Sequence, residues 1–147
     1  MSTGRLLFAL LLLFFSFNFL LSQENSITGR WMTIDDETGK PKSIVLIFEK
    51  DGKFYGKIDS LIIKPGDNPY PVCDKCPDDD PRKDQKLLGM EILKDLEKDG
   101  DEYKNGRILD PKKGKVYDCK MWLEDGKLKV RGYLLFFFRT QEWLPVK

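Results

Sequence analysis

The three cysteines are the residues of this 147-residue chain whose type and spacing best suit chemistry. Cys73 and Cys76 form a Cys-x-x-Cys pair, and Cys119 follows 43 residues later. A local disulfide between Cys73 and Cys76 would suit an exported protein, because disulfides persist in oxidising compartments. A redox-active pair would need a lowered thiol pKa, which the acidic run 78–80 opposes.

Zinc binding is a third interpretation of the cysteines. A structural zinc site needs four ligands, and only Cys119 and aspartates could complete a site begun by the Cys-x-x-Cys pair. We favour a structural disulfide between Cys73 and Cys76, and a buried, unreactive thiol at Cys119 among apolar neighbours. The redox pair and the zinc site remain as alternatives.

Other catalytic chemistry is restricted by the absence of histidine. Without His there is no Ser-His-Asp or Cys-His catalysis and no HExxH zinc site. Two acidic clusters, at 35–37 and 99–102, could collect calcium, but Asp is a common turn residue and neither has EF-hand spacing. We predict no catalytic residue, metal or cofactor, and a non-enzymatic role is favoured over an enzymatic one.

The charged residues are balanced, with 25 Lys and Arg against 24 Asp and Glu. Basic residues are interleaved with acids, so the chain has no basic stripe for nucleic acid. We expect no nucleic-acid partner.

Residues 1–22 have the pattern of a secretory signal peptide. Arg5 precedes an apolar run from Leu6 to Leu21, and Ser22 is a small residue suited to cleavage. We therefore expect an exported protein, periplasmic or extracellular. The alternative is an uncleaved N-terminal membrane anchor, since the run is only slightly short of the ~20 residues that a span needs.

The elements that must position these side chains are predicted to be strands. Residues 23–147 contain no Ala, the best helix former, so a helical bundle is disfavoured. Apolar and polar residues alternate with a period of two between dipeptides suited to tight turns. These dipeptides are Asp51-Gly52, Asp99-Gly100, Asn105-Gly106 and Asp125-Gly126. The predicted strands are 28–35, 43–50, 53–63, 87–94, 102–109, 115–124, 127–134 and 136–143.

Eight strands in chain order predict an all-β fold, an antiparallel meander that closes into an up-and-down barrel. Closure removes the exposed edges that an open meander would leave. One domain is expected over 23–147, and its segment 64–86, rich in proline and charge, is predicted to be a long loop that carries the Cys-x-x-Cys pair.

The two ends of this domain resemble the calycin superfamily, which includes the lipocalins. Gly29-x-Trp31 lies on the first predicted strand, and Arg139 on the last could place its guanidinium over the Trp31 indole. The whole motif series resembles the bacterial exported family called domain of unknown function 2147, which implies a single exported domain and no assigned activity. The motifs are Gly29-x-Trp31-x-Thr33, Asp51-Gly52 through Ile58, Cys73-x-x-Cys76, Lys83-Asp84-Gln85, Gly106 to Pro111, Gly114-Lys115-x-Tyr117, Leu128-x-Val130 to Tyr133, and Arg139-Thr140-Gln141-x-Trp143.

A barrel of this size can hold one small ligand or be filled by its own side chains. Bulky residues expected to point inward could fill the lumen completely, namely Phe48, Phe54, Tyr117 and Trp122. If the lumen is open, the candidate ligand-binding residues are Trp31, Tyr55, Tyr117, Trp122, Arg131 and Arg139.

The segment 133–138 is apolar on both faces, and an apolar patch of that kind needs cover. The candidates are a partner protein, a second copy, lipid, the N-terminal segment and the long loop. The favoured function is therefore an exported, non-enzymatic β-barrel that binds a small apolar or amphipathic ligand or acts at the cell envelope. The alternatives are a thiol or redox module using Cys73 and Cys76, and an envelope interaction protein using 133–138. The oligomeric state is not predicted.

Overall fold

Asp-Gly dipeptides make three of the tight turns that join neighbouring strands in the computed structural model, which describes residues 25–147. At 51–52 and 125–126 both residues have positive φ, as type I′ hairpin turns require, and at 99–100 only the glycine does. The expected turn at Asn105-Gly106 is wrong. These residues lie inside a strand, where Asn105 has φ 60° and the pairing with the next strand shifts, which is a β-bulge.

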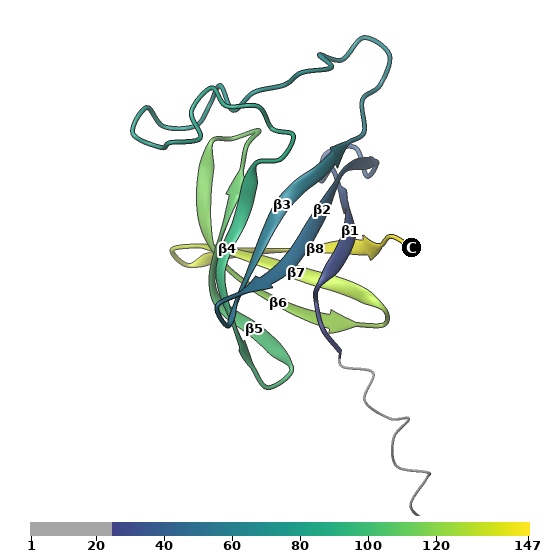
Figure 1. Ribbon diagram of the computed structural model, residues 1–147, viewed down its shortest axis with the longest axis vertical. Coiled ribbons are helices and arrows are strands. Elements are labelled where there is room, and N and C mark those ends of the chain that lie inside the picture. The colour runs from purple at the N-terminus through teal and green to yellow at the C-terminus, as the bar shows by residue number, and fades with distance from the viewer. Residues whose placement is uncertain (1–24) are drawn as a thin grey trace, which may run out of the picture.

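The eight strands pair antiparallel with their neighbours in chain order, and the last pairs with the first. This closed barrel confirms the predicted all-β up-and-down fold (Figure 1). No helix among the described residues is long and apolar enough to cross a membrane. The strands are β1 (Gly29–Ile34), β2 (Pro41–Lys50), β3 (Lys53–Leu61), β4 (Glu91–Asp99), β5 (Glu102–Asp110), β6 (Lys115–Glu124), β7 (Lys127–Leu134) and β8 (Phe137–Pro145).

Strand β4 begins four residues later than the prediction of 87–94 and ends five residues later. The apolar alternation of Leu88, Met90 and Ile92 was misleading, because Gly89 has φ 84° in a turn and Leu88 is 58% exposed. Within β4, Asp95 has φ 64° and interrupts the alternation, so that Leu93 and Leu96 are both fully buried.

The closed end of the barrel is filled by side chains from its first and middle segments. The Trp31 indole donates a hydrogen bond to the carbonyl of Ile27 at 2.8 Å, and both residues are buried. The Phe54 and Tyr103 rings meet edge to face at 4.8 Å, and the Tyr103 hydroxyl donates to the carbonyl of Asn25. These contacts tie the chain that enters β1 to the floor of the barrel.

Two of the residues expected to fill the lumen point outward. Phe48 stacks on Tyr55 outside the barrel, while Val45 and Ile47 of the same strand are buried. Trp122 lies against two cations on the outer face of β6. Fewer bulky side chains therefore point into the barrel than the sequence indicated, and the lumen is not packed solid.

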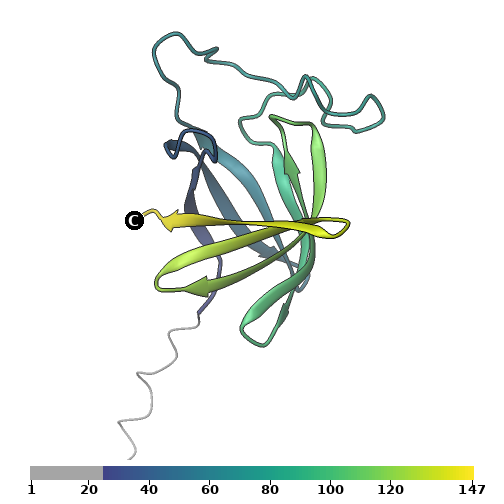
Figure 2. The same ribbon diagram turned by 180° about the vertical axis from the view of Figure 1, so that it is seen from behind.

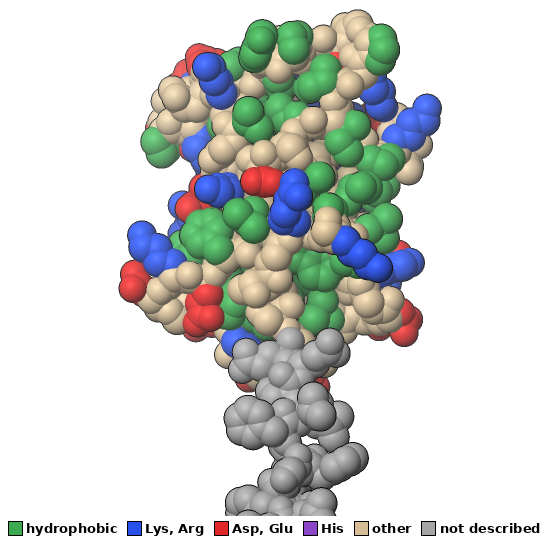
Figure 3. Space-filling view, turned by 45° about the vertical axis from the view of Figure 1, so that its right-hand side comes forward, with side chains coloured by type: hydrophobic (Ala, Val, Ile, Leu, Met, Phe, Trp, Pro, Cys, Tyr) green, Lys and Arg blue, Asp and Glu red, His purple; other side chains and the backbone are tan. Residues whose placement is uncertain are grey.

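The connection between β3 and β4 is a long irregular loop that contains residues 64–86 and arches over one end of the barrel (Figures 1 and 2). Both of its cysteines are buried, and they form a disulfide. A space-filling view of one face shows hydrophobic side chains reaching the surface between Lys and Arg (Figure 3). The predicted signal peptide, residues 1–22, lies outside the described residues.

Candidate ligand-binding cavity

The barrel holds a cavity of about 580 Å³ at the end opposite the Trp31 floor. Its walls are mainly apolar and come from most of the strands around the barrel. A volume in this range and an apolar wall are typical of small-molecule sites. The apolar and aromatic side chains of the wall are Ile58, Leu61, Ile92, Ile108, Leu109, Tyr117, Val130 and Trp143.

A few polar groups interrupt this apolar wall. The Thr33 and Ser43 hydroxyls lie 2.7 Å apart, and both residues are buried. On β8 the Trp143 indole donates to the Gln141 side-chain oxygen at 3.1 Å, and the Gln141 amide donates in turn to Asp36. Because these groups already have partners, an apolar ligand would leave no buried polar group unsatisfied.

Charged residues from two turns meet across the mouth of the cavity. Lys112, in the β5–β6 turn, contacts Glu37 at 2.7 Å and Asp35 at 3.7 Å, both in the β1–β2 turn. Arg139 of β8 contacts Asp36 at 3.3 Å. The mouth is therefore bridged by ion pairs in each of which at least one side chain is exposed, and such pairs open at little free-energy cost.

Contacts in and between these two turns also shift the pKa values of the charged side chains at the mouth. The pKa of Asp35 is lowered because its carboxylate accepts backbone hydrogen bonds from Thr38 and Glu37. The hydrogen bond between Lys112 and Glu37 lowers the pKa of Glu37 and raises that of Lys112. All three groups are charged near neutral pH. The 35–37 acids thus form a structured turn, and no group of three or more Cys, Asp or Glu in the described chain is arranged to hold a metal.

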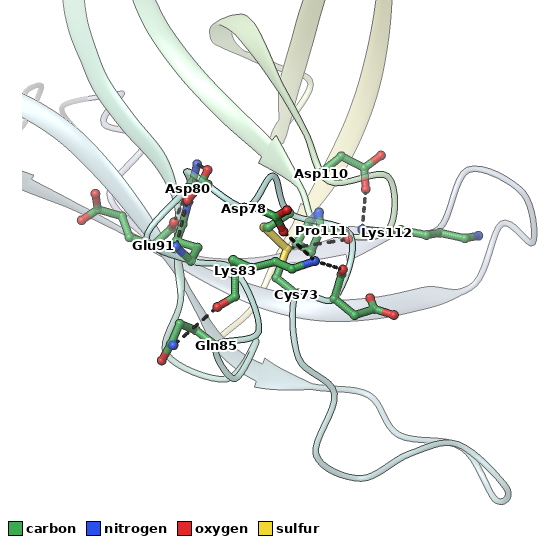
Figure 4. Close-up of a disulfide and its surroundings, with 12 residues drawn as sticks. Cys73, Asp78, Asp80, Lys83, Gln85, Glu91, Asp110, Pro111 and Lys112 are labelled. Atoms are coloured by element: carbon green, nitrogen blue, oxygen red, sulfur yellow. Dashed lines mark hydrogen bonds and ion pairs between the residues drawn. A yellow bond between two sulfur atoms is a disulfide. The ribbon is translucent and has the colours of Figure 1, made fainter.

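One side of the mouth is formed by the long loop, through Val72, Asp74 and Leu87. The disulfide holds this part of the loop against the β5–β6 turn, where the Cys73 sulfur faces the carbonyl of Pro111 (Figure 4). Gly114 fits there only because it lacks a side chain, since an added Cβ would overlap the Lys75 carbonyl.

Ionic contacts within the loop fix its shape. The Lys83 ammonium donates to the carbonyl of Asp74 at 2.6 Å, and Figure 4 shows it pointing back toward the disulfide turn. The Arg82 guanidinium binds Asp80 at 2.7 Å and donates to the carbonyl of Glu91 at the start of β4. The hydrogen bonds and charge of Arg82 lower the pKa of Asp80 to about 2.

The six candidate ligand-binding residues divide between the two faces of the barrel. Tyr117 and Arg139 line the cavity, and Trp31 lies at the closed end. The other three do not line it. Partial burial raises the pKa of Tyr55, and Asp95, which the Tyr55 hydroxyl contacts, raises it further. Arg131 lies over Trp122 at 5.0 Å.

The expected contact between Arg139 and Trp31 is absent from the described structure. Strands β1 and β8 pair Trp31 with Pro145, six residues beyond Arg139. At about 3.3 Å per residue, this offset separates the two positions by roughly 20 Å along the strand. Arg139 therefore lies at the mouth on Asp36, and Trp31 lies at the floor.

Several cavity residues were not identified from the sequence. Gln141 and Trp143 belong to a sequence motif, but they line the cavity only because of the register in which β8 pairs with β7. The sequence of β8 alone does not contain that register. The Thr33–Ser43 pair depends on the pairing of β1 with β2. The alternation of Arg139, Gln141 and Trp143 was the available signal that these side chains share one face.

Cys119 is buried, unpaired with the other cysteines and located on β6. Burial raises the pKa of its thiol to about 12. A thiol of this kind is a poor nucleophile, because the thiolate is the reactive form.

Comparison with known proteins agrees with this geometry. A structure described as "Protein HP1028 from the human pathogen Helicobacter pylori belongs to the lipocalin family" matches with a TM-score of 0.71 and 22% identity. The match covers 83% of this chain and 84% of that one, and it supports a lipocalin-like barrel. The comparison with curated proteins finds no match. A family model matches residues 29–144, nearly the whole barrel, so the chain belongs to the family described as "Uncharacterized protein conserved in bacteria (DUF2147)".

Proposed function

We propose that this protein binds one small apolar or amphipathic molecule inside its barrel and carries out no chemical step on it. The observation that carries the proposal is the cavity of about 580 Å³, with its apolar wall and few, already partnered polar groups. Such a cavity binds by removing apolar surface from water, which is worth about 25 cal/mol per Å².

An amphipathic ligand would place its apolar part against Val130, Ile92 and Trp143 and its polar end at the charged mouth. Cations and acids are both present at the mouth and neutralise each other there, so its charge does not favour one sign of head group. Entry would require the exposed ion pair between Lys112 and Glu37 to open.

We propose that the protein works after export. The apolar N-terminal run supports this, and so does the Cys73–Cys76 disulfide, since such bonds are maintained in oxidising compartments. The burial of both cysteines, at 0% and 2% exposure, supports a structural disulfide over a redox role, because exchange requires access to the sulfur.

The test is a titration with N-phenyl-1-naphthylamine, a neutral apolar fluorophore that brightens in an apolar site. We expect saturable binding with one site per chain and a Kd on the order of 1 μM, equivalent to about −8 kcal/mol. Gly132 lines the cavity, with room for a side chain beside Tyr117. Gly132→Phe should fill this space and weaken binding at least ten-fold.

The matched control is Val116→Phe, which adds a phenyl ring at an exposed position next to Tyr117 on the same sheet. Its Kd should equal that of the wild type. Binding that Gly132→Phe leaves unchanged would place the fluorophore outside the barrel and contradict the proposal.

A further inference from the structure

The turn between β7 and β8 differs from the Asp-Gly hairpin turns of this barrel. It consists of Leu135 and Phe136, which are 88% and 97% exposed. Leu135 has φ 55°, a left-handed conformation that bulky residues rarely adopt. Contact with water is unfavourable for both apolar side chains, and the left-handed backbone conformation is unfavourable for Leu135. Observed strain of this kind points to a role.

The apolar surface continues into the strands on both sides of the turn. Leu134, Phe137 and Phe138 are 46%, 77% and 62% exposed. The turn stands out at the edge of the molecule in two opposite views, as the yellow hairpin (Figures 1 and 2). Five consecutive apolar residues therefore form a protruding tip, which we call the 134–138 tip.

Cations surround the tip. The Arg131 guanidinium lies 4.5 Å from the Phe138 ring and 5.0 Å from the Trp122 ring, and only its Nε is engaged, by Thr140, among the described residues. Its terminal nitrogens can therefore donate to a further anion. Arg139 follows the tip directly on β8.

The neighbouring hairpin adds exposed Lys113 and Lys115 at the same end of the barrel, since β6 and β7 pair Asp118 with Tyr133. The acids of the β1–β2 turn at this end already bind Lys112 and Arg139, which leaves Asp110 and Asp118 as the other acids near the tip. Arg131, Lys113 and Lys115 form no ion pair among the described residues, so three cations near the tip are free to meet an anionic surface.

From these observations we propose that the 134–138 tip inserts into the surface of an anionic lipid bilayer. A narrow protruding tip of large apolar side chains needs no complementary pocket in a fluid phase, and aromatic residues with nearby cations are typical of membrane–water interfaces. Lysine and arginine near the surface are attracted by anionic head groups. Leu134 and Phe137 also line the mouth of the cavity, so the inserted tip would bring the mouth to the bilayer.

The proposal is independent of whether a ligand occupies the cavity. It is tested on the full chain, with an NBD fluorophore attached at Phe136→Cys and vesicles of phosphatidylcholine with or without 30% phosphatidylglycerol. Cys119 is buried and will not compete for the label. We expect at least a two-fold rise in NBD emission with anionic vesicles, a much smaller rise with neutral ones, and loss of the rise at high salt.

The label at Tyr70→Cys, another highly exposed position, in the long loop, is the control and should not respond. A second variant, Leu135→Asp with Phe136→Gly, installs the turn chemistry of the other hairpins and should preserve or raise thermal stability. It should reduce vesicle flotation at least ten-fold, relative to a Leu88→Ser control that removes another exposed apolar side chain. An unresponsive label on the Phe136→Cys variant would overturn the proposal. A dimer in buffer that is lost in the Leu135→Asp, Phe136→Gly variant would also overturn it, because the tip would then pack on a second copy of the chain.

Discussion

Burial decides the chemistry of individual side chains in this protein, and Cys119 is the clearest case. The thiol lies inside the sheet on β6, where no cation stabilises its thiolate and desolvation raises its pKa to about 12. The sequence predicted this unreactive state from the apolar neighbours of Cys119.

We predict that Cys119 of the native protein does not react with Ellman's reagent at pH 8, because almost none of it is thiolate. One thiol per chain should appear on unfolding in guanidinium chloride without reductant. Rapid labelling of the folded protein, or three thiols on unfolding, would contradict the assignment of one buried thiol and one disulfide.

Asp80 gives a pH-dependent contribution to stability. Its folded pKa of about 2 lies below the ordinary value of 3.8, so its stabilising effect is complete above about pH 5 and is lost as the pH falls through 2. The side chains of Asp80 and Arg82 are only 12% and 19% exposed, so solvent screening is limited. The shift corresponds to about 2 kcal/mol.

Asp80→Asn should therefore lower the free energy of unfolding by about 2 kcal/mol at pH 7 and by almost nothing at pH 2. Urea titrations of both proteins across this range provide the measurement, with Asp79→Asn, on a neighbouring exposed acid, as the control. Equal losses at both pH values would show that the contribution is not electrostatic.

At the scale of elements, the docking of the long loop on the β5–β6 turn shapes the mouth. Gly114 and Gly126 offer a matched comparison, since both have positive φ, at 65° and 73°, but only Gly114 faces another segment. An Ala at either position bears the strain of a left-handed conformation, roughly 1–2 kcal/mol.

Gly114→Ala should cost clearly more than Gly126→Ala in urea unfolding, because its Cβ would overlap the carbonyl of Lys75 and displace the loop. Proteolysis of the loop near the disulfide should also become faster in Gly114→Ala alone. Equal costs and equal proteolysis for the two variants would mean that the loop is not held by this turn.

Element prediction succeeded where local signals agreed and failed where they conflicted. Seven strands were placed to within about two residues, because alternation and turn dipeptides coincided. Strand β4 was displaced because its bulge at Asp95 interrupts the alternation, and the Asn105-Gly106 bulge resembled a turn. A bulge is defined by the partner strand, which the local sequence does not contain.

At the scale of the whole molecule, closure of the barrel depends on a short seam between β1 and β8. Among residues 25–147, only Trp31 with Pro145 and Met32 with Leu144 are paired there, and the amide of Val146 donates to the carbonyl of Arg30. The cavity residues were hard to predict because the pairing at this seam, like the register of the other strands, determines which residues of different strands lie at the same height in the barrel.

Truncation after Trp143 should remove this seam and lower the free energy of unfolding by about 2 kcal/mol or more, at roughly 1 kcal/mol per lost hydrogen bond. The freed edges should also promote self-association, which sedimentation would detect. Removal of Lys147 alone is the control. A truncated chain that stays monomeric with unchanged stability would show that closure does not depend on these residues.

Native mass spectrometry of the protein exported from a bacterial host shows directly whether the barrel holds a small molecule. We predict a wild-type species carrying one small-molecule adduct per chain, an adduct kept in Val116→Phe and lost in Gly132→Phe. A bare protein mass for the wild type, unchanged after incubation with N-phenyl-1-naphthylamine, would show that the barrel binds no such molecule.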